Sequence, residues 1–191
     1  SQKRGLMNSL SKSWFVIINP TSGNGSAKKK WPEIERLLIK HNFIFEYAFT
    51  DYSNHSKELV QFAISKSINN IISIAGDGTL HNIVNGIIHQ DIVSSNKIHV
   101  GVIPIGTGND WVKTHNIPKN IEPAIKLIKN GEIAQQDIGK IEFLNDEKAP
   151  VYFNNLAGVG FDGYVVSRVD KHKKHWCFSL SLCYTYWAIF F

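Results

Sequence analysis

The chain has 191 residues, enough for one domain of ordinary size and part of a second, and its 43% hydrophobic and 19% charged residues are typical of a folded globular protein. This composition excludes an intrinsically disordered chain. The formal net charge of +5 suits a polyphosphate ligand, an anionic membrane surface or nucleic acid equally well, so charge alone does not select among these partners.

Strands and helices alternate along the chain as far as Gly131. Short apolar or β-branched runs predict the strands, and apolar residues at helical spacing predict the helices. We expect a cap from Ser53 or Asn54 at the start of the second helix and Gly131 at the end of the last. This alternation predicts an α/β fold with a doubly wound, mainly parallel sheet, in which the loops that follow the strands share one edge. Expected strands are 14–18, 43–49, 70–75 and 97–104, and expected helices are 26–41, 53–67, 79–89 and 121–130.

The pattern changes after Gly131. Two β-like runs, 132–142 and 150–156, flank a polar turn at 145–148, with no helical period between them. We therefore expect an α/β domain over 1–131 and the start of an incomplete, β-rich second domain over 132–191.

The chain shows no sign of export or of a membrane span. Residues 1–13 are polar, are expected to be flexible, and lack the apolar core of a signal peptide. The apolar run 178–191 is shorter than the roughly 20 residues that span a bilayer. Cys177 and Cys183 lack the spacing of a zinc site or a disulfide framework. We expect a cytoplasmic protein.

The segment 176–191 is rich in aromatic residues and has no clear amphipathic period. We expect the chain to be truncated there, after a change of reading frame near Trp176. The alternative is that the basic cluster 171–175 and these aromatic residues form an element that lies peripherally on a membrane surface.

The first of three unusual loops follows the strand expected at 14–18. It reads Asn19-Pro-Thr-Ser-Gly-Asn-Gly25, in which two glycines allow close approach of the backbone and Thr21 and Ser22 offer hydroxyl groups. The helix after it presents unpaired N–H groups, an arrangement that suits phosphate. The loop lacks the spacing and the lysine of a Walker A motif, although residues 28–30 are lysines. An ordinary strand-to-helix turn uses the same residue types, so this loop alone leaves both interpretations open.

The second loop, Ala75-Gly-Asp-Gly-Thr79, follows the most apolar strand. We expect Gly76 and Gly78 to adopt unusual φ values and Thr79 to cap the next helix. Asp77 is unexpected in a phosphate-binding turn, because a carboxylate repels an anion unless it holds a cation or accepts a proton. Asp77 therefore indicates Mg²⁺ or a catalytic base; the alternative is an Asp-Gly turn that bonds its own backbone.

The third loop, Ile103-Pro-Ile-Gly-Thr-Gly-Asn-Asp110, also ends a strand. Three loops rich in Gly, Thr, Asn and Asp at successive strand ends exceed what simple turns require, and together they predict a polyphosphate site. No RNA-binding signature accompanies them, so nucleic acid is not an expected partner.

In this order and spacing, the three loops resemble the diacylglycerol kinase catalytic-domain family, which includes bacterial diacylglycerol kinases and sphingosine kinases. The resemblance also covers Asn85-Gly86, Gln136-Asp-Ile-Gly139 and Phe153-Asn-Asn-Leu-Ala-Gly-Val-Gly-Phe-Asp162, and runs from Trp14 to about Asp170. It implies a fold like that of NAD kinases and diacylglycerol kinases, with ATP between an α/β domain and a β-sandwich domain. The γ-phosphoryl group would pass to a lipid hydroxyl with the help of Mg²⁺.

The same resemblance implies roles for individual residues. Asp77 would be the catalytic residue, and Asp77, Asp110 and Asp137 would form an acidic cluster near the metal and the substrate. The implied partners are ATP and a lipid substrate at a membrane surface. The nucleotide would contact Asn19, Pro20, Thr21, Ser22, Gly23, Thr50, Gly76, Asp77, Gly78, Thr79, Leu80, His81, Asn82 and Thr107.

The sequence departs from the family pattern at two positions: Ala75 stands where a glycine is usual, and Asn82 stands where a glutamate is common. Much of the family's second domain would follow position 191. We expect the nucleotide-binding portion of an ATP-dependent lipid kinase that phosphorylates diacylglycerol or a similar lipid. The open alternatives are a non-catalytic ATP-binding fragment and, with a poorer fit of the first and third loops, an NAD-kinase-like enzyme. The acceptor lipid and the oligomeric state do not follow from the sequence.

Overall fold

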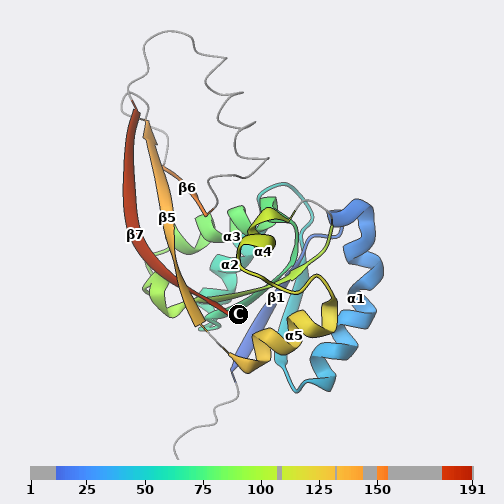
Figure 1. Ribbon diagram of the computed structural model, residues 1–191. Helices are drawn as coiled ribbons and strands as arrows, with labels where there is room; N and C mark the ends of the chain where they lie inside the picture. The colour runs from blue at the N-terminus through green and yellow to red at the C-terminus, as the bar shows by residue number, and fades with distance from the viewer. Residues whose placement is uncertain (1–11, 107–108, 132, 144–149, 155–177, 191) are drawn as a thin grey trace, which may run out of the picture.

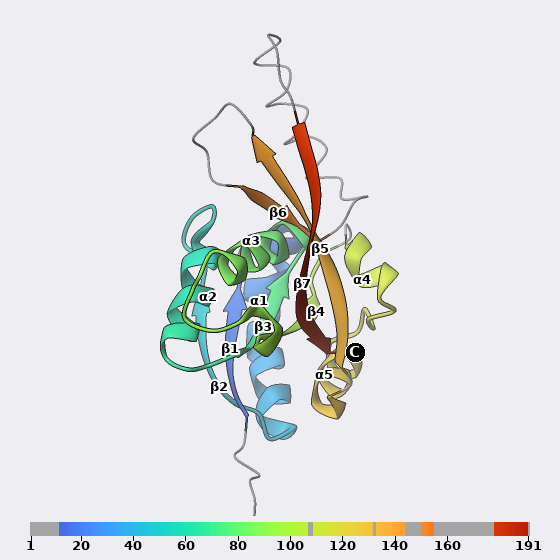
Figure 2. The same cartoon turned by 90° about the vertical axis from the view of Figure 1, so that its left-hand side faces the viewer.

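The computed structural model describes residues 12–106, 109–131, 133–143, 150–154 and 178–190. Within these ranges, seven strands form one sheet (Figure 1), and their order across the sheet is β2-β1-β3-β4-β7-β5-β6 (Figure 2). None of the helices in the described ranges combines the length and the apolar character needed to cross a lipid bilayer.

Parallel strands form the part of the sheet that carries the three loops. They are β1 (Ser13–Ile18), β2 (Ile44–Phe49), β3 (Asn70–Ala75) and β4 (His99–Pro104). The predicted α/β fold with a doubly wound, mainly parallel sheet is confirmed. Because β1 lies between β2 and β3, the strand order reverses at β1 and β3, and such a switch point is where open α/β sheets bind ligands.

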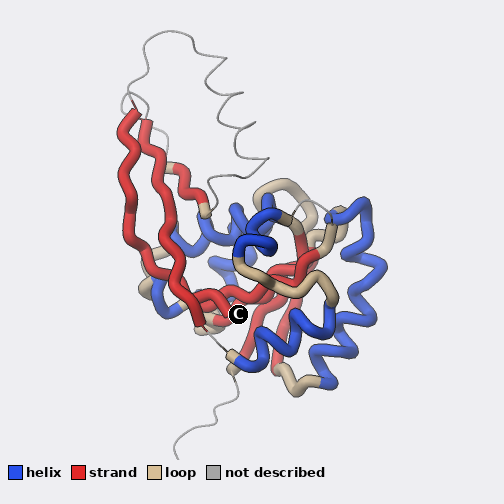
Figure 3. The backbone as a smooth tube through the Cα atoms, in the orientation of Figure 1, coloured by secondary structure: helices blue, strands red, loops and turns tan. Residues whose placement is uncertain are grey.

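Helices cover both faces of the parallel strands (Figure 3). On one face, Phe15 and Ile17 of β1 pack with apolar residues of α2 and α3. On the other face, Val16 and Ile18 pack with α1 and α5. This alternation buries both faces of the strands, which explains their continuous apolar runs. The helices are α1 (Ser22–Lys40), α2 (His55–Ser65), α3 (Asp77–Ile88), α4 (Asp110–Thr114) and α5 (Ile121–Asn130), with a 3-10 helix, η1 (Ser95–Lys97).

The start of α1 is irregular, and its regular turns begin near Ser26, as predicted. Gly23, Asn24 and Gly25 all have positive φ values, of 61°, 55° and 83°. A Cβ on Gly23 would lie 3.3 Å from the backbone of Gly106, which lies in the loop after β4. Both the left-handed conformation and this close approach favour glycine at position 23.

The remaining strands extend the sheet beyond the parallel part. They are β5 (Ile133–Phe143), β6 (Val151–Phe153) and β7 (Phe178–Phe190). β5 pairs antiparallel with both β6 and β7, and with β7 it forms a long two-stranded ribbon (Figure 2). β7 also pairs in parallel with β4, which joins this ribbon to the parallel part of the sheet. The two predicted β-like runs are confirmed where the structure describes them, and the turn expected at 145–148 lies outside the described residues.

The sequence analysis predicts neither β7 nor α4, and it does not predict the 3-10 helix η1. The strand β7 falls in an aromatic run without a period, and periodicity cannot separate strand from helix in such a run. The helix α4 has only five residues, too few for a helical period to show. Whether 1–131 and 132–191 are separate domains stays a prediction.

Gly86 sets how closely α3 approaches α2. A Cβ at this position would lie 2.3 Å from Cγ1 of Val60 and 2.7 Å from the carbonyl oxygen of Lys57. We expect Gly86→Ala to destabilise the protein by about 1–3 kcal/mol, measured by urea unfolding, because the backbone of α2 must move. Gly78→Ala is the matched control in the same helix, since its Cβ meets nothing within 4 Å. Equal stability of the two variants would contradict this packing.

Ser73 lies in the centre of the sheet on β3, and its hydroxyl is buried without a hydrogen-bond partner in the described part of the chain. An unpaired buried hydroxyl costs free energy that alanine avoids. We expect Ser73→Ala to raise the free energy of unfolding by about 1 kcal/mol, measured by chemical denaturation. A lower stability of this variant would mean that the hydroxyl of Ser73 has a hydrogen-bond partner in solution, such as a buried water molecule.

Candidate functional site

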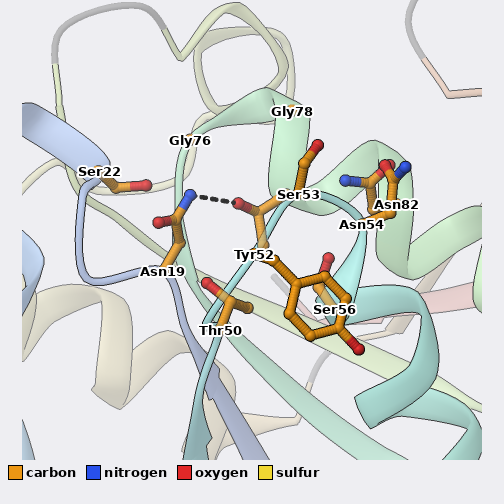
Figure 4. A pocket seen from close by; sticks show the side chains of 11 residues that line it. Asn19, Ser22, Thr50, Tyr52, Ser53, Asn54, Ser56, Gly76, Gly78 and Asn82 are labelled. Carbon is orange, nitrogen blue, oxygen red and sulfur yellow. Dashed lines mark hydrogen bonds between the residues drawn. The ribbon is translucent and has the colours of Figure 1, made fainter.

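The loops after β1 and β3 meet at the switch point of the sheet. The side-chain amide of Asn19 donates from Nδ2 to Oγ1 of Thr79 over 3.1 Å, shown as the dashed line in Figure 4. The backbone N–H of Asn19 donates to the carbonyl oxygen of Ile74 over 3.2 Å. These two bonds fix the first loop against the second.

A polar cavity of about 300 Å³ lies between these loops and the loop after β2 (Figure 4). Every side chain in its lining is uncharged, and most carry a hydroxyl or an amide. No carboxylate in the lining repels an anion, and the hydroxyls and amides can donate hydrogen bonds. The lining residues are Asn19, Ser22, Thr50, Tyr52, Ser53, Asn54, Ser56, Gly76, Gly78, Thr79 and Asn82.

Asn19 holds its own loop as well as the second one. Its Oδ1 accepts hydrogen bonds from the backbone N–H of Thr21 over 3.1 Å and from the hydroxyl of Thr21 over 2.8 Å. The orientation of the amide is therefore fixed, and one N–H of Nδ2 remains for a ligand.

The N-terminus of α3 opens into the cavity without the predicted cap. Gly76 takes the N-cap position with φ of −95°, and the hydroxyl of Thr79 accepts from Asn19 instead of capping the helix. The prediction of unusual φ values was also wrong, because neither Gly76 nor Gly78 has a positive φ. Gly78 instead leaves open space, since a Cβ there would meet nothing within 4 Å. An anion can approach the N–H groups at the start of α3 through this space, although those of Thr79 and Leu80 already donate to the carbonyl oxygen of Gly76.

Asp77 faces α4 and not the cavity. Its Oδ2 accepts from the backbone N–H of Asp110 over 3.0 Å, and its carboxylate also accepts from the backbone N–H of Trp111. Burial raises the pKa of Asp77 above 3.8, the two backbone bonds oppose this, and the charge of Asp110 raises it further. The carboxylate therefore links the loop after β3 to the start of α4.

The structure brings together two of the three predicted acidic residues. Asp110 adjoins Asp77 and pairs with Lys113, its Oδ1 lying 2.6 Å from Nζ, and this bond raises the pKa of Lys113. Asp137 is exposed on β5, where the pairing with β7 is irregular. In the described ranges, no three His, Cys, Asp or Glu residues are placed to hold a metal together. The metal role of Asp77, Asp110 and Asp137 stays a prediction.

Several predicted nucleotide contacts lie outside the lining of the cavity. Pro20, Thr21 and Gly23 belong to the first loop but do not line the cavity. Leu80 is 1% exposed and packs in the core, so its side chain is not available to a ligand. His81 lies on α3, where burial lowers its pKa. Thr107 lies outside the described residues.

The loop after β2 and the first turn of α2 supply lining residues that the sequence analysis does not predict: Tyr52, Ser53, Asn54 and Ser56. Their position after a strand, at the edge of the sheet that carries the three loops, is a sequence signal for a site. The same residue types also cap helices, and the sequence predicts Ser53 or Asn54 as the cap of α2. Asn54 is the N-cap residue of α2 with φ of 70°, and its side chain makes no capping hydrogen bond. It lines the cavity instead.

Asn85 has a structural role next to the site. Its Nδ2 donates to the carbonyl oxygen of Tyr152 over 2.7 Å, and its Oδ1 accepts from the backbone N–H of Tyr152 over 3.0 Å. His89 adds a contact of 3.1 Å from Nε2 to the carbonyl oxygen of Pro150. Asn85 and His89 therefore hold β6 against α3.

The raised pKa of Asp77 can be tested by titrating its carboxyl carbon by NMR. We expect a pKa above 3.8, which Asp110→Asn lowers and Lys113→Gln raises, because the charges of these neighbours act in opposite directions. The folded state then binds more protons than the unfolded state, so this group's contribution to stability falls as the pH rises from 3.8 through the folded pKa. A pKa at or below 3.8 would contradict the burial of this carboxylate.

Comparison with known proteins points to one family. The family described as diacylglycerol kinase catalytic domain matches residues 13–141. The chain is 32% identical over 156 residues to "Putative lipid kinase YtlR" of Bacillus subtilis (strain 168), covering 80% of this chain and 49% of that protein. It is 34% identical over 145 residues to a diacylglycerol kinase of Staphylococcus epidermidis, covering 76% of this chain and 42% of that protein.

A crystal structure of a diacylglycerol kinase from Bacillus anthracis str. Sterne has the same fold, with a TM-score of 0.61 and 27% identity over 71% of this chain and 44% of that chain. The chain spans about half the length of these relatives. The family match covers most of the parallel sheet, its three loops and β5. The chain belongs to the diacylglycerol kinase catalytic domain family.

Proposed function

We propose that this chain is the nucleotide-binding portion of a lipid kinase that transfers the γ-phosphoryl group of ATP to the hydroxyl of diacylglycerol or a similar lipid. The observation that carries the proposal is the uncharged cavity at the switch point, into which the N-terminus of α3 opens beside Gly78. The names of the relatives support the reaction class, since they are a lipid kinase and diacylglycerol kinases.

The phosphate groups of ATP suit this end of the cavity. Ser22 and Thr79 offer hydroxyls, Asn19 offers its remaining amide N–H, and the first turn of α3 offers backbone N–H groups. The lysines at 28–30 are exposed on the first turns of α1 and add positive potential to the same edge of the sheet. Positioning and charge neutralisation of this kind supply most of the catalysis in phosphoryl transfer.

Magnesium suits the pair formed by Asp77 and Asp110. Two adjoining carboxylates, one of them with a pKa raised by burial and by the other's charge, are stabilised by a cation. In the proposal these two residues would hold Mg²⁺, which supplies neutralisation of the phosphate charge. Asp77 is the proposed catalytic residue, because its carboxylate lies between the N-terminus of α3, which opens into the cavity, and the start of α4, where it could position the metal ion.

Two measurements test the proposal. The first is equilibrium binding of ATP. The second is transfer of radiolabelled phosphate from ATP to diacylglycerol in mixed micelles, with NAD tested in parallel as the acceptor. We expect ATP to bind the 191-residue chain and diacylglycerol to be the preferred acceptor. ATP binding without transfer would instead favour a non-catalytic nucleotide-binding module. Phosphorylation of NAD would favour an NAD-kinase-like enzyme.

The role of Asp77 is tested by Asp77→Asn, which removes the charge but keeps an oxygen that can accept from the backbone of α4. We expect phosphate transfer to diacylglycerol to fall by about 10²- to 10⁴-fold, and ATP affinity measured with Mg²⁺ to fall much less, because Asp110 and the cavity keep their contacts. The matched control is Asp91→Asn, which alters an exposed carboxylate after α3 and is expected to keep full activity. Equal activities of the two variants would remove Asp77 from the catalytic step.

A further inference from the structure

The cavity is lined by an aromatic residue, Tyr52, which has no part in the phosphate binding proposed above. Tyr52 lies in the loop after β2, lines the cavity and is 55% exposed. Figure 4 shows its ring away from Gly76 and Gly78, across the cavity from the N-terminus of α3. Tyr52 therefore lies at the opposite end of the cavity from the groups that suit phosphate.

The ring of Tyr52 is held rigidly. One face is stacked on the imidazole of His55, with ring centroids 4.4 Å apart and an interplanar angle of 9°. Its hydroxyl donates to Oε2 of Glu58 over 2.6 Å. The imidazole is fixed in turn, because its Nδ1 accepts from the backbone N–H of Asp51 over 3.0 Å. A ring fixed in this way loses little entropy when a second planar group stacks on it.

His55 covers one face of the ring, and more than half of Tyr52 is still exposed, so the residue keeps accessible surface for a second planar group. A purely structural stack against α2 does not require an open face on the wall of a cavity. Amide groups that can bond the edge of a planar heterocycle are at hand, because Asn54 and Asn82 also line the cavity and lie away from Asn19 in Figure 4.

Resting on the proposed function, we propose that Tyr52 is the base-stacking residue of the nucleotide site, with the sandwich ordered His55, Tyr52, nucleobase. Every nucleobase has an aromatic face, and stacking of that face on an aromatic side chain contributes to affinity whatever hydrogen bonds the edge of the base makes. The site thus selects nucleotides over plain polyphosphates, and it binds purine nucleotides more tightly than pyrimidine nucleotides because their rings overlap more of the tyrosine.

Binding of ATP and of tripolyphosphate to the 191-residue chain tests the proposal by calorimetry, since tripolyphosphate has the phosphates without the base. We expect Tyr52→Leu to weaken ATP binding by about tenfold or more and to leave tripolyphosphate binding unchanged. Tyr52→Phe is the matched control. It removes the bond to Glu58 but keeps the aromatic ring, and is expected to bind ATP within about threefold of the parent chain.

Tyr52→Trp gives a second measurement that does not depend on the leucine variant. We expect ATP to quench its added fluorescence, relative to the parent chain, and tripolyphosphate to leave it unchanged. An unchanged ratio of the two affinities in Tyr52→Leu, or quenching by both ligands alike, would overturn the role of Tyr52. Failure of the parent chain to bind either ligand would instead refute the nucleotide site itself.

Discussion

The parallel pairing of β3 with β1 and β4 is the constraint on which the functional edge depends. The registers place Ile74 beside Ile18, and Ala75 beside Pro104, so the three strands end at nearly the same level. A slip of one residue would turn every buried side chain to the opposite face, and both faces are covered by helices, so the register is firmly set. The loops that carry the polar residues are therefore forced together, with the N-termini of α1 and α3 directed at the same edge.

Two side-chain bonds extend this constraint from the strands to the chemistry. The bond from Asn19 to Thr79 joins the first loop to the second, and the bond from the backbone of Asp110 to Asp77 joins the third loop to the second. With these bonds in place, the uncharged cavity lies on one side of the N-terminus of α3, and the carboxylates of Asp77 and Asp110 lie on the other side. Such a separation suits phosphoryl transfer, in which a polyanion and a metal or base must be close without the carboxylates repelling the phosphates.

The C-terminal strands are attached beside this centre by buried polar contacts. Asn85 satisfies both backbone groups of Tyr152, as a neighbouring strand would. Gln136 on β5 accepts from Nε1 of Trp111 over 2.8 Å, and its amide donates to the carbonyl oxygen of Asn154. Because unpaired buried amides are costly, these bonds favour one placement of β5 and β6 against α3 and α4.

The sequence by itself determined the alternation of strands and helices, the parallel sheet and the three loops on one edge, because apolar periodicity and glycine-rich turns are local patterns. It also determined that Gly131 ends α5, where its φ is 76°. Only the tertiary structure decided that Asp77 faces α4, that Tyr52 stacks on His55 at the cavity wall, and that Asn85 bonds a residue 67 positions away. Contacts of this kind depend on how helices and strands pack and in which register the strands pair. The residues of a single loop determine neither the packing nor the register.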